Sequence, residues 1–216
     1  MEQSKNPIHV TILSGGIGPE RDVSLNSGTA LAEALQDHYS VELVDLKESQ
    51  VPEGLDPRQT VVFPVIHGTF GEDGSLQSML DERGFIYAGS DCEGSRLCMD
   101  KIRAKQVVEA EGVRVANDIF FTDPNELDLK LIHQELGPDL ILKPTDQGSS
   151  VALYVLKGID DLQNSLSSLP SGNWMLEQRV FGREFTVGVL RDMALGIVEV
   201  IPQGGVYDYE RKYTPG

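Results

Sequence analysis

The sequence predicts an α/β protein in which a Rossmann-like parallel-sheet unit is followed by a mixed α+β unit. In the first part of the chain, short apolar runs alternate with segments of helical periodicity, which is the pattern of βαβ units. Further along, strands follow one another and end in an antiparallel pair. The change of pattern near residue 95 predicts two domains, residues 1–95 and 96–216.

The first unit is predicted to contain four strands and two helices. The strand Ile8–Leu13 is followed by apolar residues at helical spacing as far as Leu35. Strands with so little polar alternation indicate a sheet that is covered on both faces. The remaining elements are expected as strands at Tyr39–Leu46, Thr60–Ile66 and Phe85–Gly89 and as a helix at Asp73–Arg83.

The second unit is predicted to combine helices with antiparallel strands. Its last two strands are joined by a turn at Arg191 and Asp192. Helices are expected at Met99–Glu111, Pro124–Leu136 and Ile159–Ser168. Strands are expected at Asp118–Phe121, Leu140–Pro144, Val151–Leu156, Asn173–Val180, Arg183–Leu190 and Met193–Ile201.

The composition excludes several classes of partner. Among 216 residues, 18 Lys and Arg stand against 34 Asp and Glu, a net charge of −16, which argues against nucleic acid or an anionic membrane. The apolar runs are too short to span a bilayer, and the N-terminus lacks an apolar signal core. We therefore expect a cytoplasmic protein, with Cys92 and Cys98 as buried thiols in a reducing compartment.

The loop "SGGIGPERDVS" joins the first strand to the first helix, where glycines bring backbone N–H groups to an anion. A dinucleotide fingerprint would need a third glycine after Gly16 and Gly18, but that position is Arg21. Glu20 and Arg21 instead place charges at the carboxyl end of a strand. This loop alone favours an ordinary turn with a solvated ion pair.

The loop "VIHGTFGEDGSLQ" also follows a strand, so His67 and Glu72 are expected on the same rim as Glu20. Asp73 and Ser75 are candidates to cap the next helix. A lone histidine is more often structural, but here two acids and three glycines surround it.

The stretch "LILKPTDQGSS" places Lys143 at the end of an apolar strand, where a lysine is unfavourable unless it meets an anion. The Gly-Ser-Ser loop that follows supplies amides and hydroxyls for phosphate oxygens, although it is not a Walker A loop. The alternative is a lysine that extends to solvent from an edge strand.

Two more stretches are suggestive only together with the others. In "WMLEQRVFGREFTV", Glu177, Gln178 and Glu184 flank a short connection that could contact a nucleotide, although this stretch by itself favours an exposed acidic turn. In "MDKIRAK", Lys101 belongs to three bases in five residues, which also fits one basic face of a helix.

Six stretches in order resemble the D-alanine–D-alanine ligase family of the ATP-grasp superfamily. They are "GGIGPERDVSLNSG", "HGTFGEDGSLQSMLD", "YAGSDCEGSRLCMDKIRAK", "LILKPTDQGSSVALYVL", "LEQRVFGREFTV" and "YDYERKY". The resemblance implies an incomplete ATP-grasp domain after the first unit, with its central subdomain ending at about residue 180. It also implies ATP-dependent joining of two D-alanines through an acyl phosphate for peptidoglycan, Mg²⁺ or Mn²⁺, and a homodimer formed through the N-terminal domain.

The resemblance also implies residue roles. Glu20 would hold the ammonium of the first D-alanine, and His67, with Glu72, would lie by its carboxylate. Ser149 and Tyr213 would orient substrate together with Glu20, and Lys212 would reach the transferring phosphate. ATP would be bound by Lys101, Lys143, Glu177, Gln178, Val180, Glu184 and Tyr207.

The end of the chain, "YDYERKYTPG", resembles the mobile loop that closes over the ligands in this family. The family's metal ligands are expected beyond residue 216, so we expect a truncated chain without turnover, a marginal second unit and an aggregation-prone sheet edge. The resemblance also implies that Tyr213, in the "KY" of this loop, favours a dipeptide product over the ester of D-lactate.

Three alternatives remain at this point. The chain could be a non-catalytic fragment that binds a nucleotide or dimerises, or a ligase for another amino or hydroxy acid. An NAD-dependent oxidoreductase rests on the first glycine loop alone and is disfavoured by Arg21.

Overall fold

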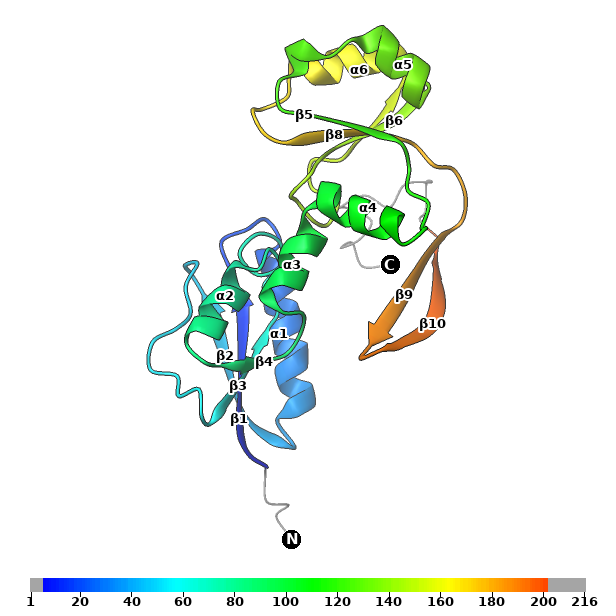
Figure 1. The fold of residues 1–216 in the computed structure, drawn as a ribbon. Helices are drawn as coiled ribbons and strands as arrows, with labels where there is room; N and C mark the ends of the chain where they lie inside the picture. Colours follow the sequence, from blue (N-terminus) through cyan, green and yellow to red (C-terminus); the bar gives the residue numbers. More distant parts are fainter. Residues whose placement is uncertain (1–5, 202–216) are drawn as a thin grey trace. The chain divides into compact units, whose positions relative to one another are not determined.

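The computed structural model describes residues 6–201, which form two compact units (Figure 1). Unit 1 consists of the chain up to Glu111 together with Asp146–Gly148, and unit 2 of Gly112–Thr145 together with the chain from Ser149 onward. The sequence places a domain boundary near residue 95, and that boundary stays a prediction.

Unit 1 contains a parallel four-stranded sheet. Its strands follow the order β2-β1-β3-β4, and every neighbouring pair is parallel. The parallel sheet predicted from the alternation of strands and helices is therefore confirmed. The strands are β1 (Asn6–Gly15), β2 (Tyr39–Leu46), β3 (Thr60–Pro64) and β4 (Ile86–Tyr87).

Helices cover both faces of this sheet. The helix α1 (Arg21–Leu35) packs on β1 and β2, where Gly28 meets Ser14. The helix α2 (Ser75–Glu82) places Leu76 and Leu80 in a core on the opposite face. Residues 10–14 of β1 are buried on both faces and are apolar except for Thr11 and Ser14.

Two consecutive helices follow β4, and the sequence predicted only the second. The helix α3 (Cys92–Met99) begins after Asp91, whose side chain accepts from the N–H of Gly94. The helix α4 (Lys101–Ala110) begins after Asp100, whose side chain accepts hydrogen bonds from the backbone N–H groups of Ile102 and Arg103. Both cysteines carry free thiols, and the expected burial is wrong for both: Cys92 is half-buried and Cys98 is exposed, because the buried position of α3 is taken by Ser95.

Unit 2 contains an antiparallel sheet with the order β5-β8-β6-β7. The helices α5 (Leu129–Leu136) and α6 (Gly158–Ser167) pack together on this sheet through one apolar core (Figure 1). A short 3₁₀ turn, Pro124–Glu126, precedes α5, which starts after the capping residue Asp128. The strands are β5 (Asp118–Phe121), β6 (Asp139–Pro144), β7 (Tyr154–Lys157) and β8 (Trp174–Gln178).

The central strand β6 has two different faces. Leu140, Leu142 and Pro144 are buried, and the two leucines belong to the core beneath the helices. Ile141 and Lys143 alternate with them and therefore point to the other face of the sheet. Only one face of the sheet is filled by helices, and this leaves the face of Lys143 for the site described below.

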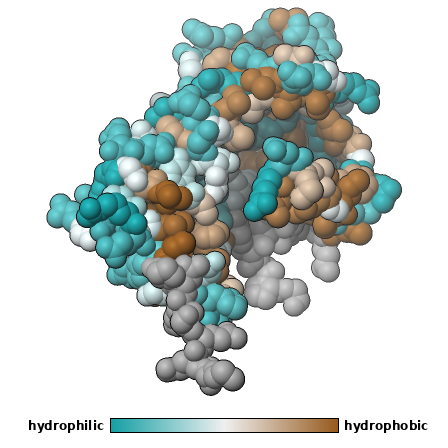
Figure 2. Space-filling model, turned by 60° about the horizontal axis from the view of Figure 1, so that its bottom comes forward, coloured by the Kyte–Doolittle hydropathy of each residue, from teal (hydrophilic) through white to brown (hydrophobic). Residues whose placement is uncertain are grey.

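The strands β9 (Glu184–Leu190) and β10 (Met193–Val200) form a separate antiparallel hairpin, with Arg191 at positive φ in its turn. All of β9 and most of β10 are exposed, and Figure 2 shows hydrophobic atoms among the hydrophilic ones on this side of the molecule. Among residues 6–201, these two strands pair only with each other. The aggregation expected of such an edge stays a prediction.

Within the part of the chain that the structure describes, no helix combines the length and the apolar character needed to cross a bilayer.

Replacing Gly28 with alanine tests the close approach of α1 to the sheet. The new Cβ would lie 2.7 Å from Cβ of Ser14 and 3.0 Å from Cδ1 of Leu43. We expect a loss of about 1–3 kcal/mol in unfolding free energy from overpacking, despite the better helix propensity of alanine. Urea unfolding followed by far-UV circular dichroism measures it. The exposed Asn26→Ala on the same helix is the control, and an unchanged midpoint for Gly28→Ala would contradict this packing.

Candidate functional site

The carboxyl ends of β1 and β3 bring two acidic loop residues together in unit 1. The side chain of Glu20, at the start of α1, is only 3% exposed. A Cβ placed on Gly68 would be 3.2 Å from Oε2 of Glu20. A Cβ on Gly148 would lie 3.6 Å from Oε2 of Glu72 and 4.0 Å from Oε2 of Glu20. Both carboxylates therefore border the same small space, beside the backbone of Gly68 and Gly148.

His67 joins these two acids. Its Nδ1 lies 3.5 Å from Oε1 of Glu72, and Oε2 of Glu72 accepts from the N–H of Gly68 at 2.9 Å. The hydrogen bond with Glu72 raises the pKa of His67, against the effect of burial, and the charges of Glu72 and Glu20 raise it further. Burial alone would raise the pKa of Glu72, but the hydrogen bonds from His67 and Gly68 and the charge of His67 lower it overall.

The second ring nitrogen of His67, Nε2, is buried and has no hydrogen-bond partner among the described residues. Buried polar atoms in folded proteins are nearly always paired, so such a nitrogen is a group on which a ligand can form a hydrogen bond. The structure thus brings together Glu20, His67 and Glu72, while their roles stay predictions.

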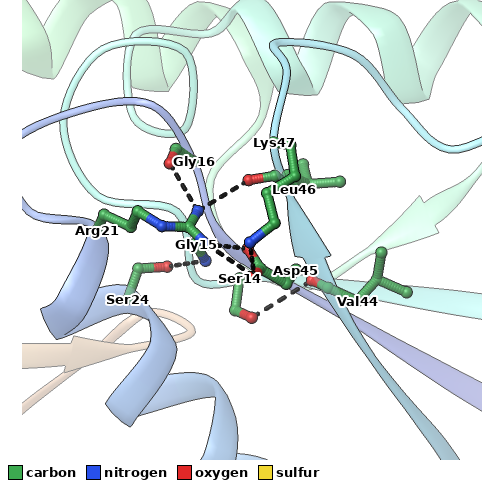
Figure 3. A network of polar contacts seen from close by, with 9 residues as sticks. All are labelled: Ser14, Gly15, Gly16, Arg21, Ser24, Val44, Asp45, Leu46 and Lys47. Carbon is green, nitrogen blue, oxygen red and sulfur yellow. Dashed lines mark hydrogen bonds and ion pairs between the residues drawn. The ribbon is translucent and has the colours of Figure 1, made fainter.

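Arg21 does not form the solvated ion pair that the first loop suggested, because its guanidinium reaches the end of β2 instead (Figure 3). It donates to both carboxylate oxygens of Asp45 at 2.7 Å, to the carbonyl of Gly16 at 2.9 Å and to that of Leu46 at 3.1 Å. Lys47 also pairs with Asp45. Hydrogen bonds from Lys47 and Arg21 hold the pKa of Asp45 below its usual range.

Lys101, the first residue of α4, donates from Nζ to the backbone carbonyl of Gln147 at 2.5 Å. Both residues belong to unit 1, because Asp146–Gly148 packs there. The predicted basic residue therefore lies against the Gln-Gly segment that precedes Ser149.

Unit 2 holds a cavity of about 680 Å³ on the face of β6 and β8 that lies opposite the helices. On its floor, Nζ of Lys143 donates to Oε2 of Glu177 at 2.5 Å, with side chains 21% and 16% exposed. β6 is a central strand, so the alternative of an edge-strand lysine is wrong. Glu177 is half-buried, so an exposed acidic turn does not describe it either. The lining includes Ile141, Lys143, Ser150, Leu153, Glu177, Gln178, Val180, Phe181, Arg183, Glu184 and Glu199.

The segment after β8 and the base of the hairpin form the other wall of the cavity. Arg183 makes two hydrogen bonds to Glu199, at 2.8 and 2.7 Å, and its guanidinium lies 4.8 Å from the ring centre of Phe185. Arg179 stacks in the same way on Phe181, at 4.7 Å. Arg179, Phe181, Arg183 and Glu199 all line the cavity, so this wall carries both charged and aromatic groups.

The Gly-Ser-Ser loop has an uncommon backbone. Ser149 and Ser150 have φ of 48° and 58°, and Ala152 follows with 52°. Left-handed residues other than glycine are strained and cluster at functional sites, and turns of this kind can present N–H groups to an anion. The strand predicted to begin at Val151 begins only at Tyr154, because these left-handed residues interrupt the extended backbone.

Three of the predicted residues, Tyr207, Lys212 and Tyr213, lie outside the described residues. Between residues 6 and 201 there is no group of three or more His, Cys, Asp or Glu side chains that could hold a metal ion.

Sequence reasoning missed several residues of these sites. Ile141 could have been found, since it shares a strand face with Lys143 by simple alternation. Asp45 lies near the carboxyl end of β2, which marks it as a candidate for the same rim as Glu20. Its contact with Arg21, however, follows only from the pairing of β2 with β1. Arg183 and Glu199 carry no local signal, because the hairpin register brings them together.

Comparisons with known proteins agree with one another. A family model described as "D-ala D-ala ligase C-terminus" matches residues 107–216. A D-alanine–D-alanine ligase of Sinorhizobium medicae is 38% identical over 96% of this chain and 68% of its own length.

Solved structures show the same similarity. D-alanyl-alanine synthetase A of Vibrio cholerae superposes with a TM-score of 0.80 and 26% identity, over 98% of this chain and 72% of that one. A D-alanine–D-alanine ligase of Bacillus anthracis complexed with ATP shares the fold, with a TM-score of 0.81 at 24% identity, over 91% of this chain and 67% of that one.

The His67–Glu72 pair predicts a titration that one substitution changes. Glu72→Gln removes the hydrogen-bonded charge, so the pKa of His67 should fall from its raised value toward or below the ordinary 6.5. Proton NMR of the imidazole measures this, and the remote Glu33→Gln is the control. A pKa of His67 that does not respond to Glu72→Gln would contradict the pairing.

The same pair predicts a pH window for stability. The lowered pKa of Glu72 makes its contribution complete above its ordinary 4.5 and lost as the pH falls through the folded value. The raised pKa of His67 makes its contribution complete below 6.5 and lost as the pH rises through the folded value. The loss of unfolding free energy caused by Glu72→Gln should therefore be largest between pH 4.5 and pH 6.5. Urea midpoints across the range measure it, and a pH-independent difference would count against it.

Proposed function

The chain belongs to the D-alanine–D-alanine ligase family, and we propose that it binds ATP and D-alanine for the ATP-dependent joining of two D-alanines to D-alanyl-D-alanine. The observation that carries this proposal is the cavity of unit 2, in which five residues predicted from the sequence to bind ATP meet. These are Lys143, Glu177, Gln178, Val180 and Glu184.

The cavity suits a nucleotide in size and in chemistry. Its volume of about 680 Å³ lies within the range of small-molecule sites. Lys143 supplies a cation for phosphate oxygens, and its partner Glu177 keeps that ammonium in place in a half-buried position. The proposed adenine contacts come from Gln178 and Val180, and Glu184 accepts from the ribose hydroxyls. The left-handed turn at Ser150 adds N–H groups on the phosphate side.

The rim of unit 1 suits an amino acid. The buried carboxylate of Glu20 is a partner for the ammonium of the first D-alanine, and a buried anion gains most from such pairing. The unpaired Nε2 of His67 suits the carboxylate, since a protonated imidazole donates from both nitrogens. Glu72 raises the pKa of this imidazole and orients the ring.

The proposed reaction proceeds in two steps. A carboxylate oxygen of the first D-alanine attacks the γ-phosphorus of ATP, the bond to the β-phosphate oxygen breaks, and ADP leaves. The amine of the second D-alanine then attacks the acyl carbon, loses a proton and expels phosphate. Such a transfer gathers anions, which lysines and N–H groups must offset. We assign Lys101 and Lys212 to this task, and Ser149 and Tyr213 to substrate orientation.

Mg²⁺ accompanies ATP in the proposed reaction. The described residues offer no cluster that fits the ion, so we derive no step through it. The proposal further includes a dipeptide product, a role in bacterial peptidoglycan synthesis, a cytoplasmic location and a homodimer formed through the N-terminal unit.

Lys143→Ala tests the nucleotide site. Loss of a charge-assisted hydrogen bond to phosphate should weaken ATP binding by roughly tenfold or more. Titration calorimetry with the 216-residue chain measures this. Lys157→Ala is the matched control, because Lys157 is an exposed lysine of the same unit that lies outside the cavity.

Two results would contradict the proposal. One is an unsubstituted chain that binds neither ATP nor D-alanine. The other is equal ATP affinity in Lys143→Ala and Lys157→Ala, which would remove the cavity from nucleotide binding. Binding of both ligands without dipeptide formation would favour the non-catalytic alternative.

A further inference from the structure

The guanidinium of Arg21 connects the first glycine loop to the end of the neighbouring strand, β2. One nitrogen serves the carbonyls of Gly16 and Leu46, and another serves both oxygens of Asp45 (Figure 3). We call this set of contacts the Arg21 clamp. The planar guanidinium holds two nitrogens at fixed positions against these two sets of acceptors, whereas a lysine has a single nitrogen and cannot serve both sets in the same way.

Gly15 packs closely against the Arg21 clamp. A Cβ on Gly15 would lie 2.7 Å from a nitrogen of Arg21 and 3.2 Å from the carbonyl oxygen of Leu46. Gly15 itself has φ of +82°, which favours glycine. The guanidinium therefore lies directly against the backbone that turns from β1 into the loop.

One helical turn later, Ser24 ties the same helix end to the other neighbouring strand. Its Oγ accepts from the N–H of Gly15 at 2.8 Å and donates to the carbonyl of Val65 at 2.6 Å. Arg21 thus fixes the start of α1 to the end of β2, and Ser24 fixes it to the segment after β3. The first turn of α1 is held from both sides.

Glu20 is the residue immediately before this fixed turn. It occupies the N-cap position of α1, yet its side chain makes no capping hydrogen bond. Its carboxylate instead lies beside Gly68 and Gly148, in the space shared with Glu72. Because Glu20 directly precedes the first turn of α1, the clamp and Ser24 hold the backbone that carries its side chain.

We propose that Arg21 is a positioning residue for D-alanine binding: through the clamp on Asp45 and the loop carbonyls, it holds the carboxylate of Glu20 where the substrate ammonium binds. This inference rests on the proposed function for the identity of the ligand. Arg21 makes no contact with substrate in this account and acts only through the backbone on either side of Glu20.

A purely electrostatic role gives the opposite sign. Arg21 is a cation next in sequence to the proposed ammonium ligand, so its long-range field opposes the binding of an ammonium. D-alanine also carries a carboxylate and Asp45 offsets the guanidinium charge, so removing that charge without any change of geometry should not weaken D-alanine binding. Removing the clamp should weaken it, because a displaced carboxylate no longer meets the ammonium.

The experiment compares the unsubstituted 216-residue chain with Arg21→Met, Arg21→Lys and Asp45→Asn. Three quantities are measured: D-alanine affinity, ATP affinity, and amide hydrogen exchange of peptides covering residues 14–24. Arg58→Met is the matched control, since Arg58 forms an exposed ion pair with Asp56 in the same unit. Asp45→Asn keeps the Arg21 bonds to the two carbonyls, so it provides a folded variant should Arg21→Met unfold.

We expect Arg21→Met to weaken D-alanine binding by roughly tenfold or more, with ATP affinity unchanged. Exchange of residues 14–24 should rise by a similar factor. Asp45→Asn should shift both in the same direction to a smaller extent, and Arg21→Lys should not restore them fully. Arg58→Met should match the unsubstituted chain.

Unchanged or tighter D-alanine binding in both Arg21→Met and Asp45→Asn would overturn the positioning role, as would unchanged exchange of the loop. Failure of the unsubstituted chain to bind D-alanine would instead overturn the substrate assignment of the proposed function. In that case the exchange data alone still decide whether the clamp orders the loop.

Discussion

Helices α5 and α6 cover only one face of the antiparallel sheet of unit 2, and this asymmetry determines which side chains face the cavity. Because side chains alternate along β6, filling one face with Leu140 and Leu142 necessarily turns Lys143 to the other. There it would be an unfavourable half-buried cation without Glu177 on the adjacent strand. The ion pair, the cavity floor and the proposed phosphate contact all follow from this one-sided packing.

Unit 1 places its proposed ligand differently, because both faces of its parallel sheet are covered. A parallel sheet of this kind offers ligands only the edge where its strands end. The loops after β1 and β3 supply Glu20 and His67 at that edge, and the Arg21 clamp binds the first loop to the end of β2. The clamp therefore links the end of β2 to the loop that carries the carboxylate of Glu20, the proposed ligand of the substrate ammonium.

The sequence predicted the strands and most helices because each has its own local pattern, and it predicted one rim for Glu20 and His67 because parallel strands share an edge. It missed α3, whose only local signal is the capping Asp91. It also treated Arg21 as a partner of Glu20, since the pairing of Arg21 with Asp45 depends on the strand order that places β2 beside β1 rather than on spacing in the sequence. The Lys143–Glu177 pair was beyond prediction for the same reason: the two residues are brought together by the register of β6 and β8.

The most direct test of this account is NMR shift mapping of the isotopically labelled 216-residue chain with ATP and then D-alanine. We expect ATP to shift the amides of Ile141, Lys143 and Glu177, and D-alanine to shift those of Glu20, Gly68 and Glu72. Shifts at both sites would support the proposed ATP and D-alanine sites. Unchanged amides of the unit 2 cavity in the presence of ATP would contradict nucleotide binding there.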